Sequence, residues 1–379
     1  MSQKLKFINT NHSTFYVTVR KRVDAYFVDN NISTFANGAM WFKSFFFLSG
    51  FIGLYLLILL GNFTPAVLLF FCVLLGMFGA FIGFNVCHDA IHKSFSANKH
   101  VNSVFGFVFN LIGASSYIWN ICHNIVHHTY TNIAGHDEDI EIAPGLIRFS
   151  PTEKVNKIQK FQHYYAFALY SLAMVTWAFK KDFKKFFQKQ IGQQKADHPR
   201  IEYFRLFFYK GIYYFLFIGL PLLVMPITGV QFIIGFLTYL FAQGLVLGLI
   251  FQLAHVVEGT EFPLPNEEGN VEEAWAAHQM RTTANFCGKS TVAAFFCGGL
   301  NQQIEHHLFP KVCHIHYPAI ANIVKTTALE HNLPYIENPT FMGALKSHYR
   351  MLRKLGKESY IDESSINLIP ISITPEGVI

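Results

Sequence analysis

Three clusters of histidines interrupt a sequence that is otherwise dominated by Phe and Leu. Their members are His88 and His92 in HDAIH, His123, His127 and His128 in HNIVHHTYTN, and His306 and His307 in QIEHH. Residues three or four positions apart share one face of a helix, so each cluster can direct imidazoles to one point. Imidazole binds iron, copper and zinc. The clusters therefore predict a metal site assembled from distant segments.

The number of histidines argues against one structural zinc. A zinc ion takes four ligands, and closed structural sites usually include cysteines. The six cysteines here are scattered without a CxxC pair, so we expect reduced thiols that take no part in metal binding. Two iron ions would use about this many nitrogens and leave positions open for dioxygen. We therefore expect two irons, with dioxygen as a co-substrate.

Other polar residues near the clusters are candidates for supporting roles. His255 closes an apolar stretch and is expected to be a further ligand, the alternative being a core histidine with satisfied hydrogen bonds. Gln303 lies one helical turn before the last histidine and could reach a metal directly or through a water. Metal-bound imidazoles usually donate their second N–H to a carboxylate or carbonyl. We assign that outer role to Asp89, Asp137, Asp139, Glu305 and His278, although Asp89, Asp137 or Asp139 could instead bind metal directly.

Composition indicates a membrane protein with one aqueous part. Of the 379 residues, 51% are hydrophobic and 14% are charged, against about 25% charged in soluble proteins. The formal net charge is only +6, and we expect a lipid partner and no nucleic acid.

Four apolar stretches are long enough to approach a membrane span, at residues 45–60, 65–84, 207–225 and 230–251. They form two hairpins whose turns, 61–64 and 226–229, contain no Lys or Arg. Because basic residues concentrate on the cytoplasmic side, we expect both turns outside and both termini in the cytoplasm.

Two further apolar stretches, 101–118 and 161–179, complicate this topology. If either crossed the membrane alone, one histidine cluster would face the opposite side from the others. We therefore expect both to be interfacial or cap helices, and expect the run FKKDFKKFFQK at 179–189 to lie on an anionic membrane surface. A short amphipathic helix is expected at 17–27, ahead of the membrane.

These expectations define an all-α integral membrane protein with four transmembrane helices and a cytoplasmic helical cap that holds the metals. We divide the chain into a cytoplasmic segment (1–40), one main domain (41–340) and a C-terminal tail (341–379), which we expect to be loose after Lys357.

The three clusters resemble the histidine boxes of membrane fatty-acid desaturases in order, spacing and intervening hairpin. The resemblance covers about residues 40–340. It implies a di-iron fold of four spans that inserts a cis double bond into an acyl chain. It also implies that the seven histidines of the three clusters bind iron, with His255 as an extra ligand. The third box here begins with Gln303 in place of a histidine. This substitution resembles the third box of front-end and related acyl-lipid desaturases.

Many front-end desaturases carry a fused cytochrome b5 domain with an HPGG motif, whereas the nearest string here is His198-Pro199-Arg200. The chain thus resembles the unfused bacterial type. A separate donor, ferredoxin or cytochrome b5, is implied, as is a bacterial inner membrane. The acyl carrier, glycerolipid or coenzyme A, stays open.

Two other functions fit parts of the pattern. A di-iron hydroxylase of fatty acids or sphingolipids would use the same ligands, but Gln303 and the HHLFP continuation favour desaturation. A non-enzymatic membrane metal-binding protein or transporter would place its polar ligands at mid-span, whereas these histidines lie at or beyond one end of the spans.

Overall fold

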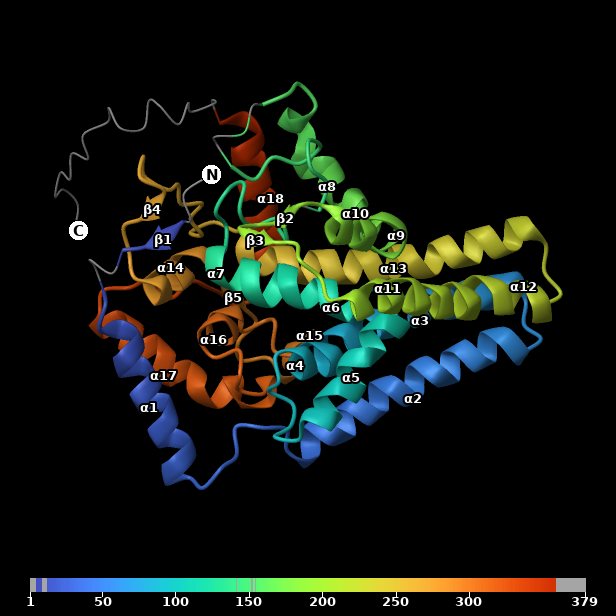
Figure 1. Cartoon of the computed structure of the whole chain (residues 1–379), viewed down its shortest axis with the longest axis horizontal. Coiled ribbons are helices and arrows are strands. Elements are labelled where there is room, and N and C mark those ends of the chain that lie inside the picture. The colour runs from blue at the N-terminus through green and yellow to red at the C-terminus, as the bar shows by residue number, and fades with distance from the viewer. Residues whose placement is uncertain (1–4, 9–11, 141, 151–152, 154, 359–379) are drawn as a thin grey trace.

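The computed structural model describes residues 5–8, 12–140, 142–150, 153 and 155–358. The described chain is mostly helical, with only two-residue strands. Long helices form a bundle that ends in a cap of shorter helices (Figure 1). The predicted all-α architecture is confirmed.

The first hairpin consists of α2 (Gly38–Leu60) and α3 (Pro65–Ile82). Asn37 caps α2 by accepting a hydrogen bond from the Met40 amide, and Pro65 opens α3 at a position where its missing N–H costs nothing. The α3 helix continues through a π-helical turn, η1 (Gly83–Cys87), into α4 (His88–Ile91). The first histidine cluster is therefore a direct extension of this span.

The second hairpin consists of α11 (Arg200–Tyr214), η5 (Phe215–Gly219), α12 (Leu220–Val224) and the long α13 (Gly229–His255). Thr228 and Gln231 form a capping box at the start of α13, and His255 is its last residue. At its closest approach to α3, a Cβ on Gly76 would lie 2.3 Å from the Tyr239 carbonyl oxygen. Only glycine allows these two helices to touch there.

Four helices are long and apolar enough to cross a membrane: 38–60, 65–91, 200–224 and 229–255. Each covers one of the four stretches expected from the sequence, the third except for its last residue. A fifth span is possible only if Lys99–Leu111 and Ser116–Tyr130, which are bent by 109° at their junction, count as one. Four apolar helices fit a multi-pass membrane protein.

The segment between the hairpins breaks into short helices. The first part contains α5 (Lys99–Leu111), α6 (Ser116–Trp119), the π-helix η2 (Asn120–His127) and α7 (His128–Tyr130). The second part contains η3 (Gln159–Phe161), α8 (Gln162–Ser171), α9 (Ala173–Thr176), η4 (Trp177–Lys181) and α10 (Asp182–Phe187). No helix of this second part is long enough to be a candidate span.

The lysines of the 179–189 run divide between two environments. Lys181 pairs with Asp139, and Lys185 pairs with Glu138. Lys180, Lys184 and Lys189 are exposed. Only these three are available to an anionic surface, because acids of the preceding loop already neutralise the other two.

The cap is assembled from both ends of the chain. It contains α1 (Phe15–Asp29), α14 (Trp275–Thr282), α15 (Thr291–Cys297), α16 (Gln303–Leu308), η6 (His314–His316), α17 (Tyr317–Glu330) and α18 (Phe341–Lys357). Helix α1 buries Phe15, Val19, Val23 and Phe27 and contacts α14 and α17. This amphipathic helix therefore uses its apolar face to pack within the cap.

Three short strand pairs tie the cap together. β1 (Lys6–Phe7) pairs with β4 (Asn270–Val271) and β5 (Asn285–Phe286) with β6 (Glu337–Asn338), both in parallel. β2 (Gln190–Ile191) and β3 (Gln194–Lys195) form an antiparallel pair.

Helix α18 occupies residues 341–357, the part of the expected C-terminal tail that precedes its loose end. It buries Met351, Leu352 and Leu355 and contacts α8. The buried Arg148 side chain donates hydrogen bonds to the Leu355 and Glu358 carbonyls, which satisfies groups that a helix end leaves unpaired. The tail beyond residue 358 lies outside the described residues.

The uncharged turns predict that the bundle end opposite the cap faces away from the cytoplasm. Cysteines introduced at the exposed positions Ala97 and Asn332 should react with an impermeant maleimide from the same side, and one at Asn62 from the opposite side. The wild-type chain is the control, because five of its six cysteines are buried and Cys72 is half-buried. Labelling of Ala97 and Asn332 from opposite sides would contradict the topology.

Candidate metal centre

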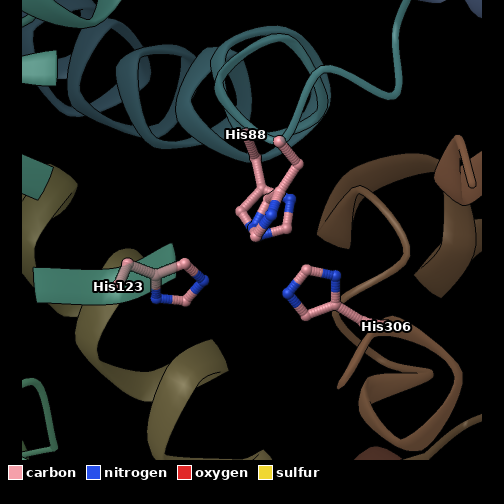
Figure 2. Close-up of side chains that lie close together, drawn as sticks. His88, His123 and His306 are labelled. Atoms are coloured by element: carbon pink, nitrogen blue, oxygen red, sulfur yellow. The ribbon is translucent and has the colours of Figure 1, made fainter. Parts of the chain in front are cut away.

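The three histidine clusters and His255 converge at the junction of bundle and cap. Three groups of nitrogens lie within 4.8 Å of one another inside each group. The groups are His88, His92, His123 and His306; His127, His255 and His307; and His128, His306 and His307. Figure 2 shows His88, His123 and His306 pointing toward one another from three separate elements. His128 shares a group with His306 and His307, so it lies between the other two groups.

Local backbone geometry sets these directions. The helices before the first cluster and through the second widen into the π-helices η1 and η2. Single π turns are rare and concentrate at functional sites. Within η2 the rings of His123 and His127 stack with centroids 5.0 Å apart, and the His88 and His92 rings are 4.7 Å apart. Trp119 stacks on His123 at 4.3 Å and closes one side of the cluster.

The eight imidazoles are all buried, and their inward nitrogens have few partners. Six of the eight imidazoles have a ring nitrogen with no hydrogen-bond partner among the described residues: His88, His92, His127, His128, His306 and His307. His123 Nε2 and His255 Nε2 contact only other nitrogens, those of His128 at 3.3 Å and Gln303 at 3.1 Å. An unsatisfied buried polar group costs roughly 1–3 kcal/mol. A set of this size fits metal ions, which would accept all of these lone pairs.

In five of these rings, in contrast, the second nitrogen, Nδ1, has a hydrogen-bond partner. His123 Nδ1 donates to Asp139 Oδ2 at 3.1 Å, and His127 Nδ1 donates to Asp137 Oδ2 at 2.9 Å. His255 Nδ1 lies 3.3 Å from the Thr282 carbonyl oxygen. These bonds fix the tautomer that leaves Nε2 facing inward. Asp137 and Asp139 thus accept hydrogen bonds from histidines of the cluster, as expected for acids that support metal-binding imidazoles.

Burial also favours the neutral, metal-binding form of the imidazoles. It lowers the pKa of His123 to about 4, an effect larger than the upward influence of Asp139. Burial, together with the neighbouring imidazoles, holds the pKa of His306 and His307 well below its usual range. These rings carry free lone pairs at neutral pH.

The other two acids do not contact the cluster. Asp89 accepts hydrogen bonds from His314 Nδ1 at 2.6 Å and Cys313 Sγ at 3.2 Å, and Lys43 Nζ lies 2.9 Å from His314 Nε2. Asp89 follows His88 directly, so on a helix it points to a different side. These contacts join the start of α2 to the cap, and the hydrogen-bond partners of Asp89 are not the histidines that the sequence analysis expected.

Glu305 likewise points away from the histidines that follow it. Its carboxyl oxygens accept hydrogen bonds from Asn285 Nδ2 at 2.7 Å and the Tyr335 hydroxyl at 2.9 Å. Burial raises its pKa to about 7, although both bonds lower it. Its observed partners link α16 to β5 and to the segment after α17.

Sequence reasoning selected His278 and missed its neighbour Gln279. The His278 ring packs against Phe7 at 5.1 Å. Gln279 Oε1 instead accepts hydrogen bonds from His307 Nδ1 at 2.6 Å and the Thr131 hydroxyl at 2.9 Å. The Tyr317 hydroxyl, 3.2 Å from His306 Nδ1, was also missed. His136 and His316 contact the backbone oxygens of Ala134 and Phe35 and lie apart from the cluster.

Asn132 holds the second cluster against the end of α13. With φ at +59°, its amide Nδ2 donates to the carbonyl oxygens of His255, Glu261 and Thr282. Asn is among the few residues that tolerate this left-handed conformation. One side chain therefore joins the loop after His128 to two segments of the cap.

Comparison with known proteins identifies close relatives of this arrangement. The sequence model of a family described as fatty acid desaturase matches residues 63–339, which include every histidine cluster. The chain is 36% identical to the sn-1 linoleoyl-lipid 6-desaturase of Synechocystis sp. over 361 residues, 94% of this chain and 99% of that protein. It is 36% identical to the acyl-lipid (8-3)-desaturase of Physcomitrium patens over 354 residues, 93% of this chain and 74% of that protein.

The nitrogen groups predict different outcomes for two buried histidines. Protein purified without oxygen should contain about two irons per chain. His255→Ala should lower that content substantially, because one of the nitrogens is removed. His278→Ala should retain most of the metal, because the ring packs outside the groups. Iron analysis normalised to protein checks both, and equal losses would contradict this ranking.

Gln279→Leu should weaken iron binding by roughly 10–100-fold, the usual cost of removing an outer partner of a metal-bound imidazole. Leu keeps the volume but cannot hold the His307 tautomer. Iron retention during titration with a chelator measures the effect, with Gln302→Leu as the matched control. Equal retention by Gln279→Leu and wild type would show that the hydrogen bond to His307 is dispensable.

Proposed function

Because this chain belongs to the fatty acid desaturase family, we propose that it inserts a cis double bond into the acyl chain of a membrane lipid, as a front-end enzyme. The observation that best supports this activity is the group of eight buried imidazoles with inward lone pairs, which lies beside an apolar cavity. Its relatives are named for acyl-lipid substrates, which favours a lipid over coenzyme A as the acyl carrier.

Two irons are the metals that fit this donor set best. His88, His92, His123 and His306 would hold one, and His127, His255 and His307 the other, with His128 between them. Bound iron would supply the reductive activation of dioxygen. Gln303, whose Nε2 lies 3.1 Å from His255 Nε2, is close enough to bind the second iron or a water on it.

An apolar cavity of about 100 Å³ reaches this centre. Its walls include Gly83, Phe109, Trp177, Leu247 and Phe251, and His88 and His123 also line it. A full acyl chain needs more room, so the cavity marks where methylenes would pass the histidines. Apolar walls would exclude water there and hold two adjacent methylenes against the metals.

The balanced reaction removes two hydrogens from neighbouring methylenes and forms one C=C bond. Together with two electrons and two protons from a donor, these hydrogens reduce one dioxygen to two waters. The sequence contains no HPGG haem motif, so we assign the electrons to a separate carrier, ferredoxin or cytochrome b5. We place the centre and both termini on the cytoplasmic side, in a bacterial inner membrane.

The test is lipid mass spectrometry of a host that expresses the chain and receives a defined fatty acid. The wild type should yield lipids two hydrogens lighter. Gln303→Leu should be inactive because the polar partner of His255 is lost, whereas Gln303→His should keep measurable activity, because imidazole can take the same place. Products that gain oxygen would indicate a hydroxylase, and unchanged lipids with full metal loading would contradict an enzymatic role.

A further inference from the structure

A second and larger cavity, of about 640 Å³, lies on the other side of α6 from the apolar one. It is bounded by α4, α5, α6, η2 and α11, and its size is in the usual range for small-molecule sites. Ser116, Tyr117 and Asn120 face it, whereas Trp119 and His123 of the same helical stretch line the apolar cavity.

The lining of this larger cavity mixes apolar side chains with hydrogen-bond donors. Lys93, Lys99 and Arg205 line it, and Arg205 pairs with Glu202. Among the described residues, Lys93 and Lys99 form no ion pair, and the Tyr209 hydroxyl and Asn120 Nδ2 form no hydrogen bond. Such a set suits a ligand rich in oxygen acceptors that carries about one phosphate.

The surroundings of the cavity connect it to the bilayer. Its walls come from α5 and α11, whose Phe107 and Tyr209 rings meet at 5.1 Å. Beside them, Val104, Phe204 and Phe208 are exposed. Because α11 begins one of the four candidate spans, this apolar edge adjoins lipid, and a membrane lipid could enter from the side.

Only a thin wall separates the cavity from the histidines. Ile91 and Asn120 line the cavity. The next residue after Ile91 is His92, a member of the candidate metal centre, and the residue before Asn120 is Trp119, which stacks on His123. Asn124 bridges this wall by donating to the Ile91 carbonyl at 3.3 Å and to Asn120 Oδ1 at 2.8 Å. A group bound in the cavity would therefore lie a short way from the metals.

We propose that this cavity binds the polar head group and ester of the membrane glycerolipid whose acyl chain is desaturated. The proposal rests on the proposed function and adds a binding site to it. A lipid 6-desaturase, the activity for which one relative is named, acts a few carbons from the ester, so the head group must be held close to the histidines. Coenzyme A carries more phosphate charge than two unpaired lysines balance, which favours a phospholipid.

A lysine footprint on the iron-loaded, full-length wild type in a detergent micelle tests the site directly. Dioleoyl phosphatidylglycerol should slow acetylation of Lys93 and Lys99 but not of the exposed Lys311 and Lys346, which are distant in sequence and do not line the cavity. Oleoyl-coenzyme A at the same concentration should protect neither pair. Equal acetylation of all four lysines with the lipid, or protection of Lys93 and Lys99 by oleoyl-coenzyme A alone, would overturn the proposal.

Variants separate head-group binding from chemistry. Lys93→Gln/Lys99→Gln should raise the KM for phosphatidylglycerol about tenfold at unchanged kcat, because charge-assisted bonds to the head group are lost. Lys311→Gln/Lys346→Gln is the matched control. Ser103→Trp should fill the cavity and weaken lipid binding while iron content stays at the wild-type level. Wild-type KM in both cavity variants would overturn the site, whereas a wild type that binds the lipid without desaturating it would overturn the proposed function alone.

Discussion

Nitrogen lone pairs buried away from water impose the main constraint on this molecule. Each unsatisfied group costs roughly 1–3 kcal/mol, and whole domains are stable by only about 5–15 kcal/mol. The inward nitrogens of the eight imidazoles would therefore lower the stability of the folded state unless metal ions accept their lone pairs. Much of the surrounding structure serves to hold these rings in place. Asp137, Asp139 and Gln279 fix tautomers, and Asn132 joins the second cluster to the end of α13.

The bundle and the cap depend on each other through this centre. His88 continues α3 through η1, and His255 ends α13, so two membrane-length helices supply imidazoles of the candidate metal centre directly from their ends. The cap contributes His306 and His307 from a helix of only six residues, α16. Buried links such as Lys43–His314–Asp89 fasten that cap to the start of α2. The two parts are consequently one structural unit.

Sequence alone could predict the features that local spacing and hydropathy determine. The four long apolar helices follow from runs of Phe and Leu, and the convergence of three clusters follows from their chemistry. The supporting contacts were harder to predict because they depend on which way neighbouring residues point. Asp89 and Glu305 each adjoin a candidate ligand yet face other partners, and His278 was chosen where Gln279 makes the contact. A step of one residue on a helix rotates a side chain to another face, and only tertiary packing shows which face meets the cluster.

The order of the clusters along the chain has a consequence for biosynthesis. The nitrogen groups combine His88, near the first hairpin, with His306 and His307, which are followed by only 72 of the 379 residues. Proteins are made from the N-terminus, so no four-histidine group exists until most of the chain has left the ribosome and both hairpins have been inserted. Metal bound by these groups would therefore load only after most of the chain has been made. A chain truncated before α16 would retain its membrane helices but would lack part of every nitrogen group, and the cell would have an inserted protein unable to take up its metal.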